Sequence, residues 1–235
     1  MLRIDQLRLL PDEPETVLLH KCARLLRVEP SALTGLTVLR RAIDARESLT
    51  FVYTVIVSAP QETALLRRCR DKRVTAYAPE QYALPASVDA PAVRPIVVGA
   101  GPAGLFAALV LAKCGARPIL LERGQCVEQR QRDVQRFWAT GELDTESNVQ
   151  FGEGGAGAFS DGKLNTGTRD VRHRFIMEQL VSCGAPADIL TDALPHVGTD
   201  MLHIALQRLR RQLLDAGADI RFGARLEGLT VQEGA

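Results

Sequence analysis

Two short segments of the sequence carry the glycine spacing G-x-G-x-x-G, Gly99 to Gly104 and Gly152 to Gly157. Glycines at this spacing let a backbone turn approach the pyrophosphate of a dinucleotide, whose charge is held by the amides and the dipole of a following helix. That chemistry requires a strand before the first glycine and a helix after the last one. The two copies must therefore be judged by the elements that flank them.

The first copy has both flanking elements. The apolar run 96–98 predicts a strand, and residues 105–113 predict a helix. Within the turn, Gly99 allows the tight bend, Gly101 lets the backbone approach the phosphates, and Gly104 lets the helix pack on the strand. We therefore expect a dinucleotide site at this copy.

A second apolar run follows the helix and ends at Glu122. This is about 20 positions beyond the turn, where an acidic residue accepts hydrogen bonds from the adenosine ribose. A carboxylate at this place disfavours a 2′-phosphate, so FAD or NAD is expected rather than NADP, although the neighbouring Arg123 weakens that preference.

The second copy lacks the required context. The residues before it, "ESNVQF", are mostly polar, and "AFSDGKLNT" after it is typical of a loop. Two interpretations stay open: a flexible surface loop, or a segment of small residues that lets a flat polar ligand approach the backbone. Ser160, Asp161, Lys163 and Asn165 would supply polar groups to such a ligand.

The chain divides into three parts by its pattern. Residues 1–77 predict the order β-α-β-β-α-β, which is typical of a small ferredoxin-like α+β domain. Residues 78–94 contain three prolines and no sustained periodicity, which indicates a linker. Residues 95–235 predict an α/β fold with a parallel sheet, a Rossmann-like dinucleotide-binding domain.

Composition narrows the functional class. The 29 basic and 28 acidic residues nearly cancel, so no net charge attracts nucleic acid. No apolar stretch is long enough for a membrane span, and the N-terminus does not resemble a signal peptide. The five scattered cysteines contain no C-x-x-C pair, which argues against a zinc site or a redox disulfide and for a reducing compartment. We expect a cytoplasmic protein; its oligomeric state is not indicated.

The sequence resembles a family of uncharacterised bacterial FAD-dependent dehydrogenases, distant relatives of geranylgeranyl-reductase and glutathione-reductase-like flavoproteins. The segments that carry the resemblance are "VVGAGPAGLFAALVLAKCGARPILLERG", "VEQRQRDVQRFWATGELDTESNVQFGEGGAGAFSDGKLNT", "PHVGTDML" and "RRAIDAR". The family implies an FAD cofactor, with NAD(P)H as a possible electron donor, and a small-molecule substrate or redox partner. The resembling proteins are about twice as long and carry a ribityl-binding segment not found here, which suggests a truncated chain.

The resemblance also implies roles for individual residues. It places the second glycine segment near the isoalloxazine ring and Glu122 on the ribose. The expected cofactor-binding residues, from the turn, the acidic strand end and the second segment together, are Gly99, Gly101, Pro102, Ala103, Gly104, Glu122, Arg123, Arg130, Gly154, Gly155, Ser160, Asp161, Gly162 and Lys163.

Three assignments have competing interpretations. Arg130 lies where related flavoproteins place a phosphate- or ribose-binding arginine, or it belongs with Arg132 and Arg136 to a solvated helix face. His196 is a proton donor near the flavin, or a structural residue bonded to the backbone. Lys163 is the other weak catalytic candidate, because a positive group near the ring would stabilise reduced flavin. Trp138 is expected in the core.

The residues thus predict an FAD-dependent oxidoreductase of unknown substrate. Two alternatives remain open: a dehydrogenase with NAD as its only cofactor, and a non-catalytic dinucleotide-binding or interaction protein or an inactive fragment. The dinucleotide site rests on residues 95–122 alone, whereas the enzyme class rests on the resemblance.

Overall fold

The computed structural model describes residues 1–89, 91–164 and 170–231. The chain forms two compact units, each described here by itself. The N-terminal unit comprises residues 1–81 together with 187–195, and the second unit comprises residues 82–186 and 196–235. Within the described residues, no helix is both long and apolar enough to cross a membrane.

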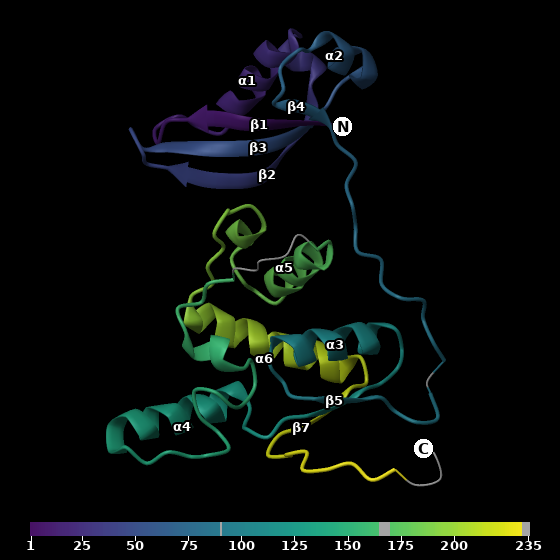
Figure 1. The fold of residues 1–235 in the computed structure, drawn as a ribbon, viewed down its shortest axis with the longest axis vertical. Coiled ribbons are helices and arrows are strands. Elements are labelled where there is room, and N and C mark those ends of the chain that lie inside the picture. The colour runs from purple at the N-terminus through teal and green to yellow at the C-terminus, as the bar shows by residue number, and fades with distance from the viewer. Residues whose placement is uncertain (90, 165–169, 232–235) are drawn as a thin grey trace. The chain divides into compact units, whose positions relative to one another are not determined.

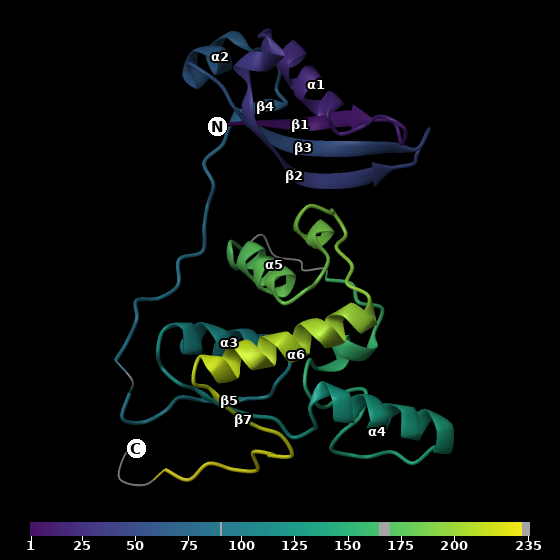
Figure 2. The same ribbon diagram turned by 180° about the vertical axis from the view of Figure 1, so that it is seen from behind.

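The N-terminal unit is a four-stranded antiparallel sheet with two helices on one face (Figures 1 and 2). The strand order is β2-β3-β1-β4. Its elements, in chain order, are β1 (Leu2–Leu9), α1 (Val17–Leu26), the 3-10 turn η1 (Pro30–Ala32), β2 (Thr34–Asp44), β3 (Thr50–Ser58), α2 (Glu62–Arg68) and β4 (Val74–Ala76).

Strand β1 contains a bulge at the point where the alternation of its apolar residues shifts by one position. Leu2 and Ile4 are buried on one face of β1, and Leu7 and Leu9 are buried on the same face although the alternation has shifted by one. A bulge between Ile4 and Leu7, with Gln6 in the left-handed region at φ 59°, provides the extra residue. An extra residue in one strand restores the facing of the side chains that follow it.

Residues 187–195 belong to the N-terminal unit through Arg41 of β2. The Arg41 amide donates to the carbonyl of Thr191 at 2.7 Å, and its guanidinium pairs with Asp192 at 2.9 Å. The sequence pattern predicts these residues as part of the domain 95–235, because no local pattern connects them with a strand about 150 positions earlier.

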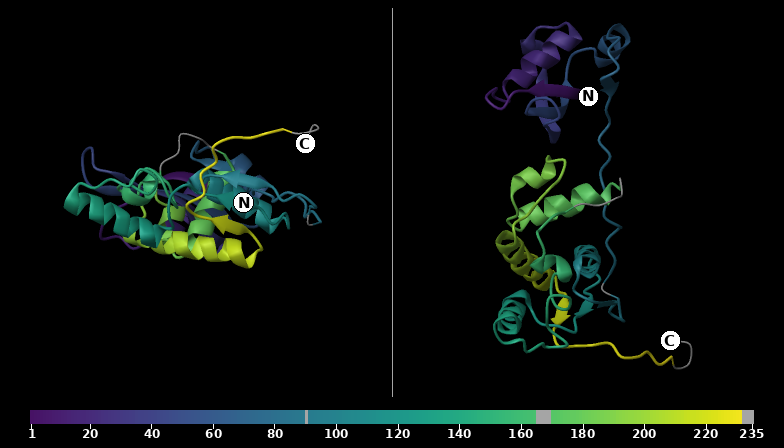
Figure 3. Two further views of the ribbon diagram at one scale, coloured as in Figure 1. Left: turned by 90° about the horizontal axis from the view of Figure 1, so that it is seen from below. Right: turned by 60° about the vertical axis from the view of Figure 1, so that its left-hand side comes forward.

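The second unit contains a three-stranded parallel sheet in the order β5-β6-β7. Helices α3 and α6 contact each other and the sheet, and β7 follows α6 as a short arrow (Figures 1 and 3). The elements are β5 (Ile96–Val98), α3 (Pro102–Lys113), β6 (Ile119–Leu121), α4 (Val127–Thr140), η2 (Ala156–Phe159), α5 (Arg172–Ser182), η3 (Ala187–Leu190, in the N-terminal unit), α6 (Thr199–Asp215) and β7 (Asp219–Arg221).

Residues 78–94 contain no helix or strand among those described, and part of this segment is hydrogen-bonded to the C-terminal end of α3. The Val88 amide donates to the Cys114 carbonyl at 2.9 Å, and the Cys114 thiol donates to the Pro85 carbonyl at 3.4 Å. The end of α3 is therefore held by the segment that precedes the sheet.

One prediction about the core is wrong. Trp138 was expected to be buried, but its side chain is 66% exposed near the end of α4. The buried face of α4 consists of Val127, Arg130, Asp133 and Val134. Two of these four buried residues are charged, and Trp138 lies outside this face of the helix.

Candidate functional site

The glycines of the first turn have different physical roles. Gly99 lies in the left-handed region at φ 95°, directly after β5. A Cβ on Gly104 would lie 1.8 Å from the Gly99 carbonyl oxygen, so only glycine lets α3 pack against the turn. Gly101 is the N-cap of α3 with φ −71°, and a Cβ there would meet no atom within 4 Å. Neither conformation nor packing within the protein therefore requires a glycine at position 101.

Pro102 and Ala103 open α3. Proline at the first helical position has no N–H to leave unpaired and has a φ suited to the helix. The N-terminus of α3 therefore points its free amides and its positive dipole end toward the turn. An anionic group beside Gly101 would meet both.

The carboxylate of Glu122 organises the backbone around this turn. It is buried and follows β6 directly. One of its oxygens accepts from the Ala100 amide at 2.6 Å, and the other accepts from the amides of Gly124 and Gly152 at 2.8 and 3.1 Å. A carboxylate has about four lone-pair positions, so about one stays available for a ligand hydroxyl.

The second glycine segment lies directly against the first. The Gly154 amide donates to the Ala100 carbonyl at 2.8 Å, and a Cβ on Gly155 would lie 3.3 Å from Pro102. No strand leads into this segment and only the four-residue η2 follows it, which agrees with the prediction that it is not a strand-turn-helix motif. Instead, the two glycine-rich segments form adjacent walls of one site.

A cavity of about 290 Å³ lies where these segments meet. Its volume is slightly below the 300–1,000 Å³ that is typical of small-molecule pockets, so it would hold only part of a dinucleotide. Its lining combines the first turn, the end of β6, the second glycine segment and the stretch after β7, namely Val98, Gly99, Gly101, Leu121, Glu122, Arg123, Gln150, Phe151, Gly152, Gly155, Ala224, Arg225 and Leu226.

Arg123 is held at the rim of this cavity. Its guanidinium lies 3.8 Å from the centre of the Phe151 ring and pairs with Glu146 at 3.0 Å. Arg225, after β7, pairs with the same Glu146 at 3.2 Å. Sequence reasoning did not identify Arg225 or Phe151, because the cavity that they line is formed by segments that lie far apart in the chain.

Arg130 has neither of the environments that were considered for it. Its side chain is fully buried in α4, so it does not belong to a solvated helix face, whereas Arg132 and Arg136 are exposed. Its guanidinium donates to the carbonyls of Asn148, Val149, Glu153 and Gly155 at 2.7 to 2.8 Å. At least four of its five N–H donors are thus used inside the protein, and burial lowers its pKa to about 10. This geometry supports a role in ordering the second glycine segment.

The predicted flavin-proximal residues divide into two groups. Gly155 lines the cavity beside Gly101, whereas Gly154 packs against Leu206 of α6, where a Cβ would approach to 2.5 Å. Ser160, Asp161 and Lys163 are exposed and do not line this cavity. Asn165 lies outside the described residues.

The two weak catalytic candidates are brought together. Lys163 and His196 are paired in an isolated antiparallel bridge, and the Val197 amide donates to the Gly162 carbonyl at 2.9 Å. Lys163 forms an ion pair with Asp161 at 2.7 Å, and the hydrogen bond to that carboxylate raises the pKa of the lysine. Helix α6 begins at Thr199, three residues after His196, and its N-cap is Gly198.

A buried carboxyl that sequence reasoning missed lies beneath the second glycine segment. Glu153 is fully buried, and one of its oxygens accepts from the Val127 amide, at the start of α4, at 2.8 Å and from Arg210 of α6 at 2.7 Å. Its other oxygen has no hydrogen-bond partner. Arg210 also pairs with Glu128. Glu153 therefore connects the glycine segment to two helices.

Burial raises the pKa of the Glu153 carboxyl from 4.5 to about 7. The folded chain therefore binds this proton more tightly than the unfolded chain, and the associated stability is lost as the pH rises from about 4.5 to about 7. We expect wild type to lose stability relative to Glu153→Gln across this range, because the amide stays uncharged. Urea unfolding at several pH values measures the difference.

The control for this experiment is Glu142→Gln, at an exposed glutamate in the same unit. The difference between this variant and wild type should not vary with pH. Parallel stability curves for wild type and Glu153→Gln would contradict the assigned burial effect.

Comparison with known proteins gives three findings. Residues 94–156 match the FAD binding domain family, and residues 1–58 match a domain of unknown function (DUF8436). The chain is 39% identical over 236 residues to an uncharacterized protein of Clostridium beijerinckii, covering 99% of this chain and 44% of the relative. The chain thus spans less than half the length of this relative. The FAD binding domain match covers the first glycine turn, Glu122 and most of the second glycine segment, and such domains are typical of flavin oxidoreductases.

Proposed function

We propose that this chain carries the adenosine and pyrophosphate part of the FAD site of an FAD-dependent dehydrogenase. The observation that carries the proposal is the glycine at position 101. It has an ordinary φ and an unobstructed Cβ direction, and it faces a cavity at the N-terminus of α3. Since the protein itself leaves room for a side chain there, we infer that the glycine serves a bound ligand, and a pyrophosphate fits the amides that the helix presents.

The residues around the cavity fit the adenosine half of the cofactor. The α3 amides would hold the pyrophosphate, and the remaining acceptor position of Glu122 would take a ribose hydroxyl. Arg123 would lie at the rim, where its ion pair with Glu146 holds it back from the carboxylate of Glu122. The cofactor, when bound, supplies hydride transfer, while this chain positions it.

The second glycine segment is proposed to extend toward the flavin end. Gly155 is the point at which it borders the cavity, and a glycine there keeps the backbone close to Gly101. Ser160, Asp161, Gly162 and Lys163 continue from this point, and we propose that they approach the ring when cofactor binds. Lys163 would then favour the anionic reduced flavin, with His196 beside it on the bridging segment.

At the level of domains, we infer a Rossmann-like second unit and a ferredoxin-like N-terminal unit. The parallel order β5-β6-β7 with α3 after the first strand supports the former. The antiparallel order β2-β3-β1-β4, with both helices inserted as split βαβ units, supports the latter. The use of NAD(P)H as electron donor and a cytoplasmic location stay predictions.

Flavin absorption of the purified chain tests the proposal. We expect the protein to be yellow as purified, or to become so on incubation with FAD followed by gel filtration. A colourless protein that binds NADH with high affinity would instead support an NAD-only enzyme. If neither ligand binds, the chain is not a functional dinucleotide site on its own and the proposal is wrong for this chain.

A further inference from the structure

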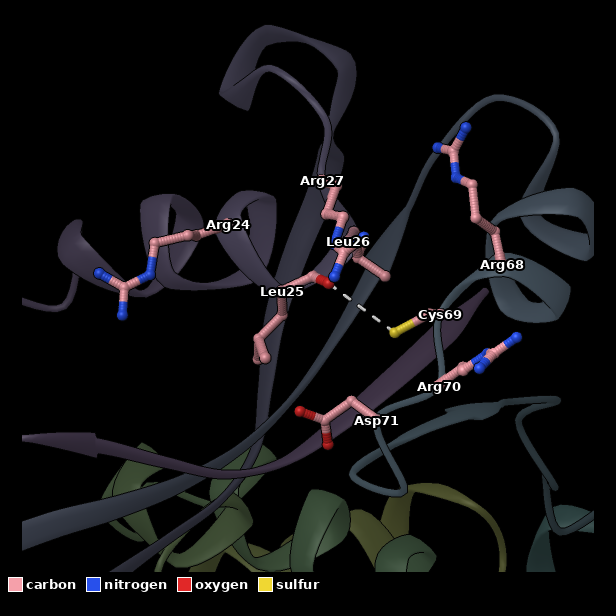
Figure 4. Close-up of a pocket in the computed structure, with 8 residues that line it drawn as sticks. All are labelled: Arg24, Leu25, Leu26, Arg27, Arg68, Cys69, Arg70 and Asp71. Atoms are coloured by element: carbon pink, nitrogen blue, oxygen red, sulfur yellow. Dashed lines mark hydrogen bonds between the residues drawn. The ribbon is translucent and has the colours of Figure 1, made fainter.

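A cavity of about 670 Å³ lies in the N-terminal unit, whereas both glycine segments belong to the second unit. It is formed where α1 ends and where the chain leaves α2, and the close-up in Figure 4 shows the side chains around it. The eight lining residues are Arg24, Leu25, Leu26, Arg27, Arg68, Cys69, Arg70 and Asp71.

The lining is strongly basic. All four arginines are exposed, and within the described residues none of them forms an ion pair. Several other arginines of the unit are paired: Arg3, Arg8 and Arg46 each pair with an aspartate at 2.8 to 2.9 Å. Four unpaired guanidinium groups around one cavity repel one another unless an anion binds among them.

The one acidic residue of the cavity does not neutralise this charge. Both carboxylate oxygens of Asp71 are hydrogen-bonded to Arg73, which is not part of the lining, with the shortest distance at 2.7 Å. The C-terminal end of α1 adds a partial negative charge of about half a unit, well below four positive charges. The cavity thus keeps a net positive potential.

The walls of the cavity are fixed relative to each other. The Cys69 thiol donates to the Leu25 carbonyl at 3.7 Å, which ties the end of α2 to the last turn of α1 (Figure 4). Leu26 is buried beneath, and Arg27 ends α1 in the left-handed region at φ 55°. The left-handed conformation is disfavoured for arginine, so glycine or asparagine would be the ordinary choice at this position.

We propose that this cavity binds a compact anion with two or more phosphate groups. Guanidinium groups bind phosphate oxygens in pairs of parallel hydrogen bonds. The arginine side chains spread apart around the cavity in Figure 4, so an anion with several phosphate groups, rather than a single phosphate, is needed to reach more than one of them. The volume lies in the range of small-molecule pockets. None of the eight lining residues is aromatic, so the cavity offers no platform on which a nucleic acid base would stack.

Calorimetric titration of the whole 235-residue chain with inorganic triphosphate tests this site. We expect saturable binding that weakens with added NaCl, a loss of about tenfold or more in affinity for the double variant R27Q/R68Q, and a loss of about threefold or more for Arg68→Gln alone. The matched control is Arg67→Gln, an exposed arginine next to Arg68 on α2 that is not part of the lining. It should bind triphosphate within about twofold of wild type, because it removes the same charge one position away.

Saturating FAD should leave the triphosphate affinity unchanged, because the proposed cofactor site belongs to the other unit. Absence of triphosphate binding, an equal loss in Arg67→Gln, or complete displacement by FAD would each overturn the proposal. Tighter binding of a single-stranded oligonucleotide through the same arginines would also overturn it, since the partner would then be nucleic acid. Circular dichroism of the double variant should match wild type, because both side chains are exposed.

Discussion

Replacing Glu122 by alanine is expected to lower the free energy of unfolding by about 3 kcal/mol or more and to abolish FAD binding. The reason is that the carboxylate accepts from three buried amides, those of Ala100, Gly124 and Gly152. Each buried donor left without a partner destabilises the fold by about 1–3 kcal/mol. Ala100 belongs to the first glycine segment and Gly152 to the second, so the variant would no longer hold these two walls of the cavity in their relative position.

Urea unfolding and FAD titration measure the two parts of this prediction. Glu122→Gln should give an intermediate loss, because the amide oxygen still accepts while its NH2 group does not. The control is Glu142→Ala, an exposed glutamate of the same unit, whose stability should stay within about 0.5 kcal/mol of wild type. A stable Glu122→Ala variant would show that other groups hold the two segments in place.

The second large effect is expected from Arg130→Met. Methionine approximates the length of the arginine stem but leaves buried carbonyls of residues 148–155 without donors. Each buried polar group left without its partner destabilises the fold by about 1–3 kcal/mol, so several lost together should lower stability by about 3 kcal/mol or more. Arg130→Lys should also be destabilising, since a compact ammonium cannot reach carbonyls that the planar guanidinium reaches from three nitrogens.

Amide hydrogen exchange locates this effect. In Arg130→Met, exchange should increase first at residues 148–155, before the sheet of the same unit is affected. Arg132→Met, at an exposed position two residues later on α4, should leave both exchange and stability near wild type. Uniform loss of protection across the second unit would contradict a local role and indicate a general core defect.

The parts of the site that could be predicted are those set by short-range pattern. The strand, turn and helix around Gly99 follow one another within 20 residues, and Glu122 closes the next strand at a fixed distance. That the protein itself does not need a glycine at position 101 could be recognised only with coordinates. Sequence spacing indicates a role, whereas the structure distinguishes Gly104, which packing requires, from Gly101, which borders a cavity.

The parts that could not be predicted depend on long-range pairing. The helical pattern predicts Arg130 on a solvated face and the family resemblance predicts a phosphate- or ribose-binding role, yet its acceptors lie 18 to 25 residues later in an irregular segment. The partner of Glu153, Arg210, is 57 residues away. The prediction for Trp138 was wrong because it equated hydrophobicity with burial. The inner face of this helix holds an arginine and an aspartate, and the tryptophan is exposed. Buried polar networks have no simple signature in sequence.

The central claim, that the turn at Gly101 holds the cofactor pyrophosphate, is tested most directly by FAD affinity in Gly101→Ala. An alanine there meets no protein atom and has an ordinary φ, so the free energy of unfolding should stay within about 0.5 kcal/mol of wild type. The added methyl group would occupy the approach to the α3 amides, so FAD affinity should fall by about tenfold or more. Gly228→Ala, at an equally unobstructed glycine outside the cavity lining and outside both glycine segments, should bind FAD as wild type does. Unchanged FAD affinity in Gly101→Ala would contradict the account.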